Sequence, residues 1–178
     1  MLRERKVTSQ GPMQYATKED FCRIFSTDMN RLYQLSFLLT GNHQSAERCF
    51  VGGLEDSAKG PVFKEWAQSW ARRTIIRNAI QLMRPRPFDR NTTTVSQGVT
   101  DPASVAIFEL PAFDRFVFVI AVLEGYSDQE CSLFLDCAQV EVVAARTRAL
   151  QQVARSAQIL PVRLGIGSNE PLPAAIPA

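Results

Sequence analysis

The sequence has few of the residues that catalysis and metal binding require. It contains one histidine, His43, which we expect on the surface without a chemical role. No GxSxG motif and no Gly-rich phosphate loop after a strand occurs, so neither nucleophilic catalysis nor nucleotide binding has a candidate site. None of the four cysteines has CxxC spacing, and no zinc site of common spacing can be assembled. We therefore expect no enzyme activity, no cofactor and no metal.

Long hydrophobic runs are also missing. No apolar segment approaches the roughly 18 residues of a membrane-spanning helix. Residues 1–14 are charged and lack an apolar core behind them, which argues against a signal peptide. The cysteines lie in helical patterns and indicate small buried residues in a reducing compartment: Cys22, Cys49, Cys131 and Cys137. These features predict a cytoplasmic protein without membrane insertion.

The charge of the chain is small in total but unevenly distributed. The formal net charge is only +2. Between Gly60 and Arg90, however, seven basic residues stand against two acidic ones, which gives a local net charge of +5. A concentrated basic segment is what a phosphate-binding surface requires, although basic residues on a helix are more often simply solvated.

The most regular pattern lies between Leu110 and Leu150 and predicts three short helices. Gly125 is a natural helix stop, and Ser127 with Glu130 forms the sequence of a capping box. A third helix is expected from about Ala138. Its inward stripe is Val142, Ala145, Ala149 and Val153. Two helices joined by such a short turn have the spacing of a helix-turn-helix, in which the second helix enters the DNA major groove.

Several residues of this stretch occur in an order that is unusual outside one family. They are Leu110-Pro111, Arg115, Val117-Phe118, Leu123-Glu124-Gly125-Tyr126-Ser127, Glu130 and the ending Arg148-Ala149-Leu150. This order resembles region four of an extracytoplasmic-function sigma factor over about forty residues. The resemblance implies a region four-like helix-turn-helix domain that contacts the minus-thirty-five promoter element. The implied DNA-binding residues there are Gln139, Glu141, Arg146 and Arg148.

The first half of the chain resembles sigma region two. An amphipathic helical stretch from Phe21 to Gly41 is followed by Ala46 and Glu47, which match the segment with which sigma factors grip core RNA polymerase. The resemblance therefore implies polymerase binding by these two residues. The glycines Gly52 and Gly53 interrupt the expected helix, at about 1 kcal/mol for each glycine.

A tryptophan followed by an arginine-rich turn and an asparagine lies between Pro61 and Arg84. In sigma factors the corresponding helix melts and holds the minus-ten promoter element. The resemblance implies DNA binding by Arg72, Arg73, Arg77, Asn78 and Arg84. Arginine suits this task because its planar guanidinium binds phosphate through two hydrogen bonds. Trp66 and Trp70, at helical spacing, are expected to be core anchors more often than base-stacking platforms.

The distribution of proline, glycine and polar residues predicts an all-α protein of two small helical domains joined by a flexible linker. The expected segments are a flexible arm at 1–16, a region two-like bundle at 17–84, a linker at 85–102, a region four-like domain at 103–157 and a disordered tail at 158–178.

Two functions from different classes are compatible with these residues. The first is a bacterial sigma-like transcription initiation factor that binds core RNA polymerase and promoter DNA, with an anti-sigma factor as a further partner. The alternative is a regulatory protein that keeps the sigma fold but acts through protein–protein binding without promoter recognition. The alternative depends on departures from the family, because Ser45, Arg48 and Val51 replace the usual docking residues. It also depends on the recognition helix, which carries no Lys or Arg before Arg146.

Overall fold

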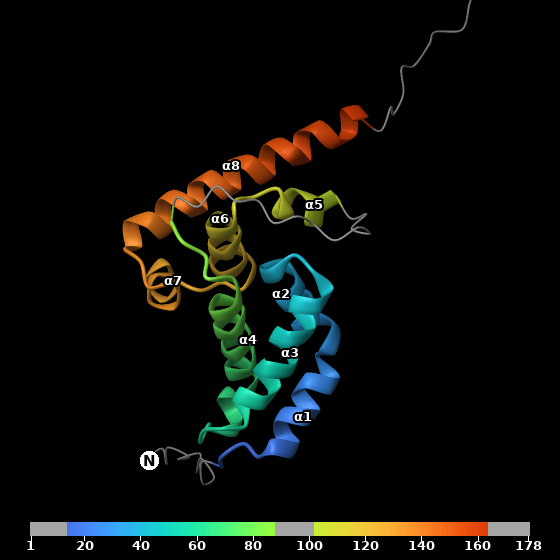
Figure 1. Ribbon diagram of the computed structural model, residues 1–178, viewed down its shortest axis with the longest axis vertical. Helices are drawn as coiled ribbons and strands as arrows, with labels where there is room; N and C mark the ends of the chain where they lie inside the picture. The colour runs from blue at the N-terminus through green and yellow to red at the C-terminus, as the bar shows by residue number, and fades with distance from the viewer. Residues whose placement is uncertain (1–13, 88–101, 164–178) are drawn as a thin grey trace, which may run out of the picture.

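The computed structural model describes residues 14–87 and 102–163, and these residues are almost entirely helical (Figure 1). The first range holds α1 (Lys18–Thr27), α2 (Met29–Thr40), α3 (His43–Ser57), the 3-10 turn η1 (Lys64–Trp66) and α4 (Ala67–Met83). The second range holds α5 (Pro102–Phe108), α6 (Ala112–Val117), the π-helical turn η2 (Phe118–Leu123), α7 (Asp128–Leu135) and α8 (Gln139–Arg163). The predicted all-α class is confirmed.

The helices of the first group begin and end at residues that suit their positions. Thr17 and Asp20 form a capping box at the start of α1, because each accepts from the other's backbone N–H. The helical stretch predicted from Phe21 divides at Asp28, which ends α1 and precedes α2. At the end of α2, Gly41 has φ 78°, a left-handed conformation that glycine adopts without strain.

Gly52 and Gly53 do not interrupt the third helix, contrary to the sequence-based prediction. α3 runs through both residues. A Cβ atom on Gly53 would lie 2.7 Å from Cγ1 of Ile75, and one on Gly52 would lie 2.7 Å from Oδ1 of Asn78. The two glycines therefore let α3 approach α4 closely, and this packing offsets their low helix propensity.

The second group contains two helices joined by a short turn. Ser127 and Glu130 form the predicted capping box at the start of α7, and Gly125 has φ 75° at the predicted stop. Asp136 ends α7 with φ 49°, an uncommon conformation for a residue other than glycine. The long helix α8 then begins at Gln139. Of its predicted inward stripe, Val142, Ala145 and Ala149 are buried, and Val153 is partly buried against the core.

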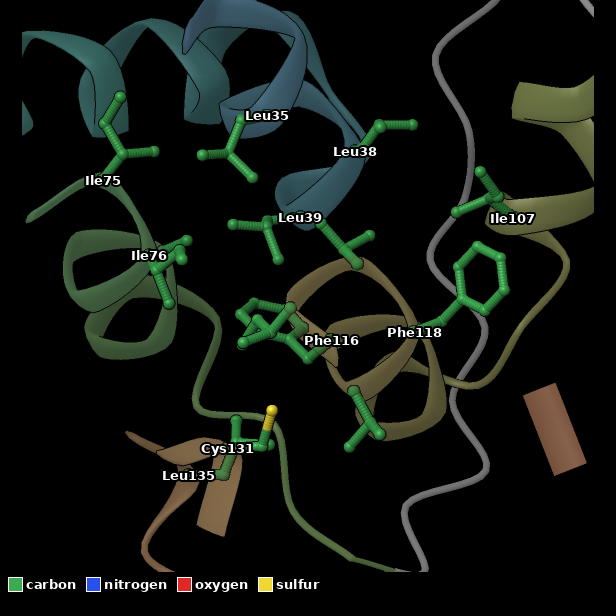
Figure 2. Packing of buried hydrophobic residues seen from close by; sticks show 14 of the residues in the cluster. Leu35, Leu38, Leu39, Ile75, Ile76, Ile107, Phe116, Phe118, Cys131 and Leu135 are labelled. Atoms are coloured by element: carbon green, nitrogen blue, oxygen red, sulfur yellow. The ribbon is translucent and has the colours of Figure 1, made fainter. Parts of the chain in front are cut away.

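One hydrophobic cluster joins the two groups of helices. Figure 2 shows Leu35 and Leu39 of α2 and Ile76 of α4 facing Phe116 of α6, with Cys131 of α7 beyond. Leu39, Ile76, Phe116 and Cys131 are each 0% exposed. The side chain of Arg115 is also fully buried, and its Nη2 donates a 3.2 Å hydrogen bond to the carbonyl oxygen of Leu39. The two predicted modules are thus packed against each other.

Some predictions of segment boundaries and environment differ from the structure. The second group begins at Pro102, inside the predicted linker, and α8 extends to Arg163, beyond the predicted end of the domain at residue 157. Most of the predicted arm, linker and tail lies outside the described residues. Of the four cysteines predicted to be buried, Cys49 and Cys131 are buried, Cys137 is only partly buried, and Cys22 is exposed, so the prediction is wrong for Cys22.

Within residues 14–87 and 102–163, no helix is both long and apolar enough to cross a membrane. The same residues contain no group of three or more His, Cys, Asp or Glu side chains positioned to hold a metal ion.

Candidate nucleic-acid interface

Arg77 and Arg84 form the exposed part of the basic helix α4. The guanidinium carbon of Arg77 lies 5.8 Å from the ring centroid of Trp70, within the range of a cation–π contact. Arg84 ends α4 with φ 46°, and its backbone N–H donates to the carbonyl of Ile80. Neither guanidinium takes part in an ion pair within the described residues. These two predicted DNA-binding residues are therefore available to phosphate.

Arg73 has protein partners on the second group of helices. Its Nη2 donates to Oε1 of Glu130 at 2.9 Å. Its guanidinium also lies 5.6 Å from the ring centroid of Tyr126 and 5.8 Å from that of Phe134. Sequence reasoning placed Glu130 only in a capping box, and did not anticipate that its carboxylate also reaches an arginine 57 residues away.

Arg72 is paired in a similar way. Its Nη1 lies 3.9 Å from Oε2 of Glu124, and the side chains are 24% and 10% exposed. That carboxylate oxygen is buried and accepts no hydrogen bond within the described part of the chain. Arg72 and Arg73 are thus both held by carboxylates of the second group.

Asn78 is held by hydrogen bonds between helices α3 and α4. Its Nδ2 donates to Oδ2 of Asp56 and to the carbonyl of Thr74, both at 2.9 Å. Hydrogen bonds from Lys59 and Asn78 lower the pKa of the Asp56 carboxyl. This predicted DNA-binding residue therefore also braces the α3–α4 contact.

An aromatic pocket adjoins the N-terminal end of α4. It has a volume of about 630 Å³, and its lining includes Phe63, Trp66, Trp70 and Arg73. Trp66 is 57% exposed, so the prediction that it anchors the core is wrong; only Trp70 packs partly against a small buried cluster. The physical reason is that η1 precedes α4, so Trp66 lies outside the helical register that pairs it with Trp70. Exposed rings beside arginines can stack on unpaired bases.

The predicted DNA-binding residues of α8 lie mostly in contacts within the protein. Arg148 donates from Nε and Nη2 to the two oxygens of Asp114, at 2.9 and 2.7 Å. Arg146 pairs with Asp128 at 3.0 Å. The other two predicted residues, Gln139 and Glu141, differ in their exposure and contacts.

Gln139 is exposed, whereas Glu141 accepts a hydrogen bond from the backbone N–H of Ala138 at 2.9 Å. Glu141 therefore caps its own helix. Of the four residues predicted to bind DNA from α8, only Gln139 is both exposed and without a side-chain hydrogen bond or ion pair among the described residues.

Ala46 and Glu47 differ sharply in accessibility. Ala46 is 0% exposed, so its side chain packs α3 into the core and does not reach the surface. Glu47 is exposed and lines a groove of about 490 Å³ between α2 and α3. Sequence reasoning missed the apolar side chains of this groove. They are Met29, Tyr33, Phe37, Phe50 and Val51.

Comparison with known proteins gives a structural likeness but no sequence match. No family model matches the chain, and no curated protein matches it. The sigma factor RpoE from Bartonella quintana, solved as a co-crystal with the anti-sigma factor NepR, is similar over 79% of this chain and 98% of its own. The identity is 15% and the TM-score is 0.49, values that assign no activity to the chain.

Proposed function

We propose that this protein is a sigma-like transcription initiation factor that binds promoter DNA through α4 and the pocket beside it. The observation that carries the proposal is the cation–π contact of Arg77 with Trp70, a ring that lines one pocket together with the exposed Trp66. Phosphate contacts from an arginine fix the position of a strand, while aromatic rings stack on its unpaired bases. A melted promoter element offers both groups.

The groove between α2 and α3 supports the proposal that the same group of helices docks on core RNA polymerase. Met29 and Val51 are 54% and 52% exposed, and Glu47 lies beside them. Exposed apolar side chains gathered in a groove suit a protein partner. The resemblance of residues 32–47 to sigma region two names that partner as polymerase.

The decisive experiment has two arms, a pull-down with core RNA polymerase and an anisotropy titration of labelled single-stranded DNA. We expect polymerase capture, and DNA affinity that falls steeply with salt because bound arginines release counterions. Arg77→Ala should lower single-strand affinity by about fivefold and reduce the salt slope by about 0.7 units. Arg31→Ala removes an exposed cation from α2 and is the matched control. No capture and no salt-dependent binding would contradict the proposal.

A second candidate function is protein–protein regulation without promoter recognition. It is favoured by the outward face of α8, where helical periodicity gathers Val140, Val143, Ala144 and Thr147, all exposed. The first part of this face, from Gln139 to Ala145, holds no cation that could bind phosphate. A regulator of this kind would bind duplex DNA with little dependence on salt, and would retain a protein partner such as an anti-sigma factor.

A further inference from the structure

The arginine surface of α4 is partly covered by a segment of the protein itself. Glu124 and Glu130 lie against Arg72 and Arg73, and two aromatic rings flank the Arg73 guanidinium. We propose that the segment from Glu124 to Phe134 competes with single-stranded nucleic acid for these two arginines and holds the site partly closed. The inference depends on the proposed function, since it assigns a regulator to the same surface.

The covering segment presents the chemical groups of a single strand. The carboxylate of Glu130 contacts Arg73 through a charge-assisted hydrogen bond, as a phosphate would, and that of Glu124 lies 3.9 Å from Arg72 as an ion pair without a hydrogen bond. Its rings, Tyr126 and Phe134, are T-shaped with centroids 5.3 Å apart, and both lie within cation–π range of Arg73. A single strand that binds α4 must therefore put its phosphates in place of the carboxylates and its bases in place of the two rings.

The carboxylate of Glu130 is positioned by its own helix. Its Oε2 accepts from the backbone N–H and from the hydroxyl of Ser127, at 3.0 and 2.9 Å. The other oxygen, Oε1, is the one that meets Arg73. The capping box of α7 thus fixes the acid in place, and little side-chain entropy is lost when the arginine binds it.

The contact is weak enough to be displaced. The side chains of Arg73 and Glu130 are 43% and 41% exposed, and ion pairs of this exposure contribute about 1 kcal/mol or less. Displacement needs only that the guanidinium groups change partner, so the shared hydrophobic core can stay intact. Arg77 and Trp66 lie outside the contact and offer the strand its first attachment.

The test is an anisotropy titration of labelled oligo(dT) with the full chain and with Glu124→Gln, Glu130→Gln and the double variant. Glutamine at 130 can still accept from Ser127, so α7 keeps its cap. The apparent affinity of a partly closed site equals its intrinsic affinity multiplied by the fraction of molecules in which the site is open. We expect the double variant to bind about three- to tenfold more tightly, because the exposed Arg73–Glu130 pair contributes about 1 kcal/mol or less and the longer Arg72–Glu124 contact is not hydrogen-bonded.

Asp20→Asn is the matched control. Asp20 occupies the same position in the capping box of α1 and also pairs with basic side chains, Arg23 and Lys64, but it does not contact the arginines of α4. It removes one negative charge and so reports the general effect of net charge. An equal gain for Asp20→Asn and Glu130→Gln would overturn the inference.

Two further variants separate this inference from the proposed function. In an Arg73→Ala background, Glu130→Gln should give no further gain, because its partner is gone; a persisting gain overturns the inference. Glu124→Gln alone provides an independent arm if the Glu130 variant fails to fold, since the Glu124 side chain, unlike that of Glu130, forms no capping hydrogen bond. If oligo(dT) binds and depends on Arg77 while all acid variants match wild type, the inference fails and the proposed function stands. If no variant binds oligo(dT) at low salt, both fail.

Discussion

Replacing Gly53 by alanine tests the close approach of α3 to α4, which positions the basic helix. Gly53 is buried within α3, and an added Cβ would lie 2.7 Å from Cγ1 of Ile75 and 3.4 Å from its backbone nitrogen and Cα. One turn later, the Ser57 hydroxyl donates to the carbonyl of Gly53 at 2.7 Å and shares a 2.8 Å hydrogen bond with Thr74. Any outward shift of α3 strains this buried polar contact.

The magnitude follows from two opposing effects. Alanine is favoured over glycine inside a helix by about 1 kcal/mol. Overpacking a well-packed interface costs typically about 1–3 kcal/mol, and here the obstructing atoms belong to a branched side chain and to backbone. Straining the Ser57–Thr74 hydrogen bond adds to this cost, about 1 kcal/mol if it is lost. We therefore expect Gly53→Ala to destabilise the fold by about 1–2 kcal/mol.

The assay is urea unfolding followed by circular dichroism, with Gly52→Ala as the matched control. A Cβ on Gly52 meets only the end of the Asn78 side chain, which can rotate away. Loss of the Asn78 hydrogen bonds, about 1 kcal/mol, is offset by the gain in helix propensity, so this control should remain near wild type. A Gly53→Ala protein as stable as wild type, or more stable, would refute the packing argument.

Three other predictions concern stability. Asp136→Gly should raise the free energy of unfolding by about 1 kcal/mol, because glycine adopts φ 49° without the strain that a side chain brings; an unchanged melting temperature would count against strain there. Arg148→Ala should lower the free energy of unfolding by about 2 kcal/mol, since it leaves the carboxylate of Asp114, which is 8% exposed, without its partner. Arg31→Ala is its control, and equal melting temperatures of the two variants would contradict this role. Hydrogen bonds lower the pKa of Asp56 and Glu130. The free energy of unfolding should therefore be constant at pH values above the ordinary carboxyl pKa, and should fall as the pH drops below about 4. A urea midpoint that rises on acidification would reverse this sign.

The sequence was most informative where structure is local. The capping box of Ser127 and Glu130, the stop at Gly125 and the buried stripe of α8 depend on residues a few positions apart, and all three are present. Such features follow from helix geometry alone. The start of α4 was less predictable, because Pro61 is compatible with a helix start but η1 intervenes before Ala67.

Contacts between distant residues could not be derived from periodicity. The pair Arg73–Glu130 joins residues 57 apart, and nothing in either local pattern selects the partner. The glycines of α3 were misjudged for a related reason, since helix propensity describes an isolated helix and not one pressed against Ile75. The burial of Ala46 and the exposure of Trp66 likewise depend on which neighbours are present, not on residue type.

The charge pattern of the sequence does contain one clue to the long-range arrangement. Residues 109–137 hold six acidic residues and one basic residue, and residues 60–90 have the opposite excess. In the structure, four of those acids pair with arginines that the sequence assigns to DNA: Glu124 with Arg72, Glu130 with Arg73, Asp128 with Arg146 and Asp114 with Arg148. Each of these guanidinium groups already pairs with a carboxylate. Binding of a nucleic acid therefore gains only the difference in free energy between the new phosphate contact and the internal ion pair that it replaces. The two DNA-assigned arginines of α4 and its C-cap that form no ion pair within the described residues, Arg77 and Arg84, are therefore the ones at which binding to a phosphate backbone should begin.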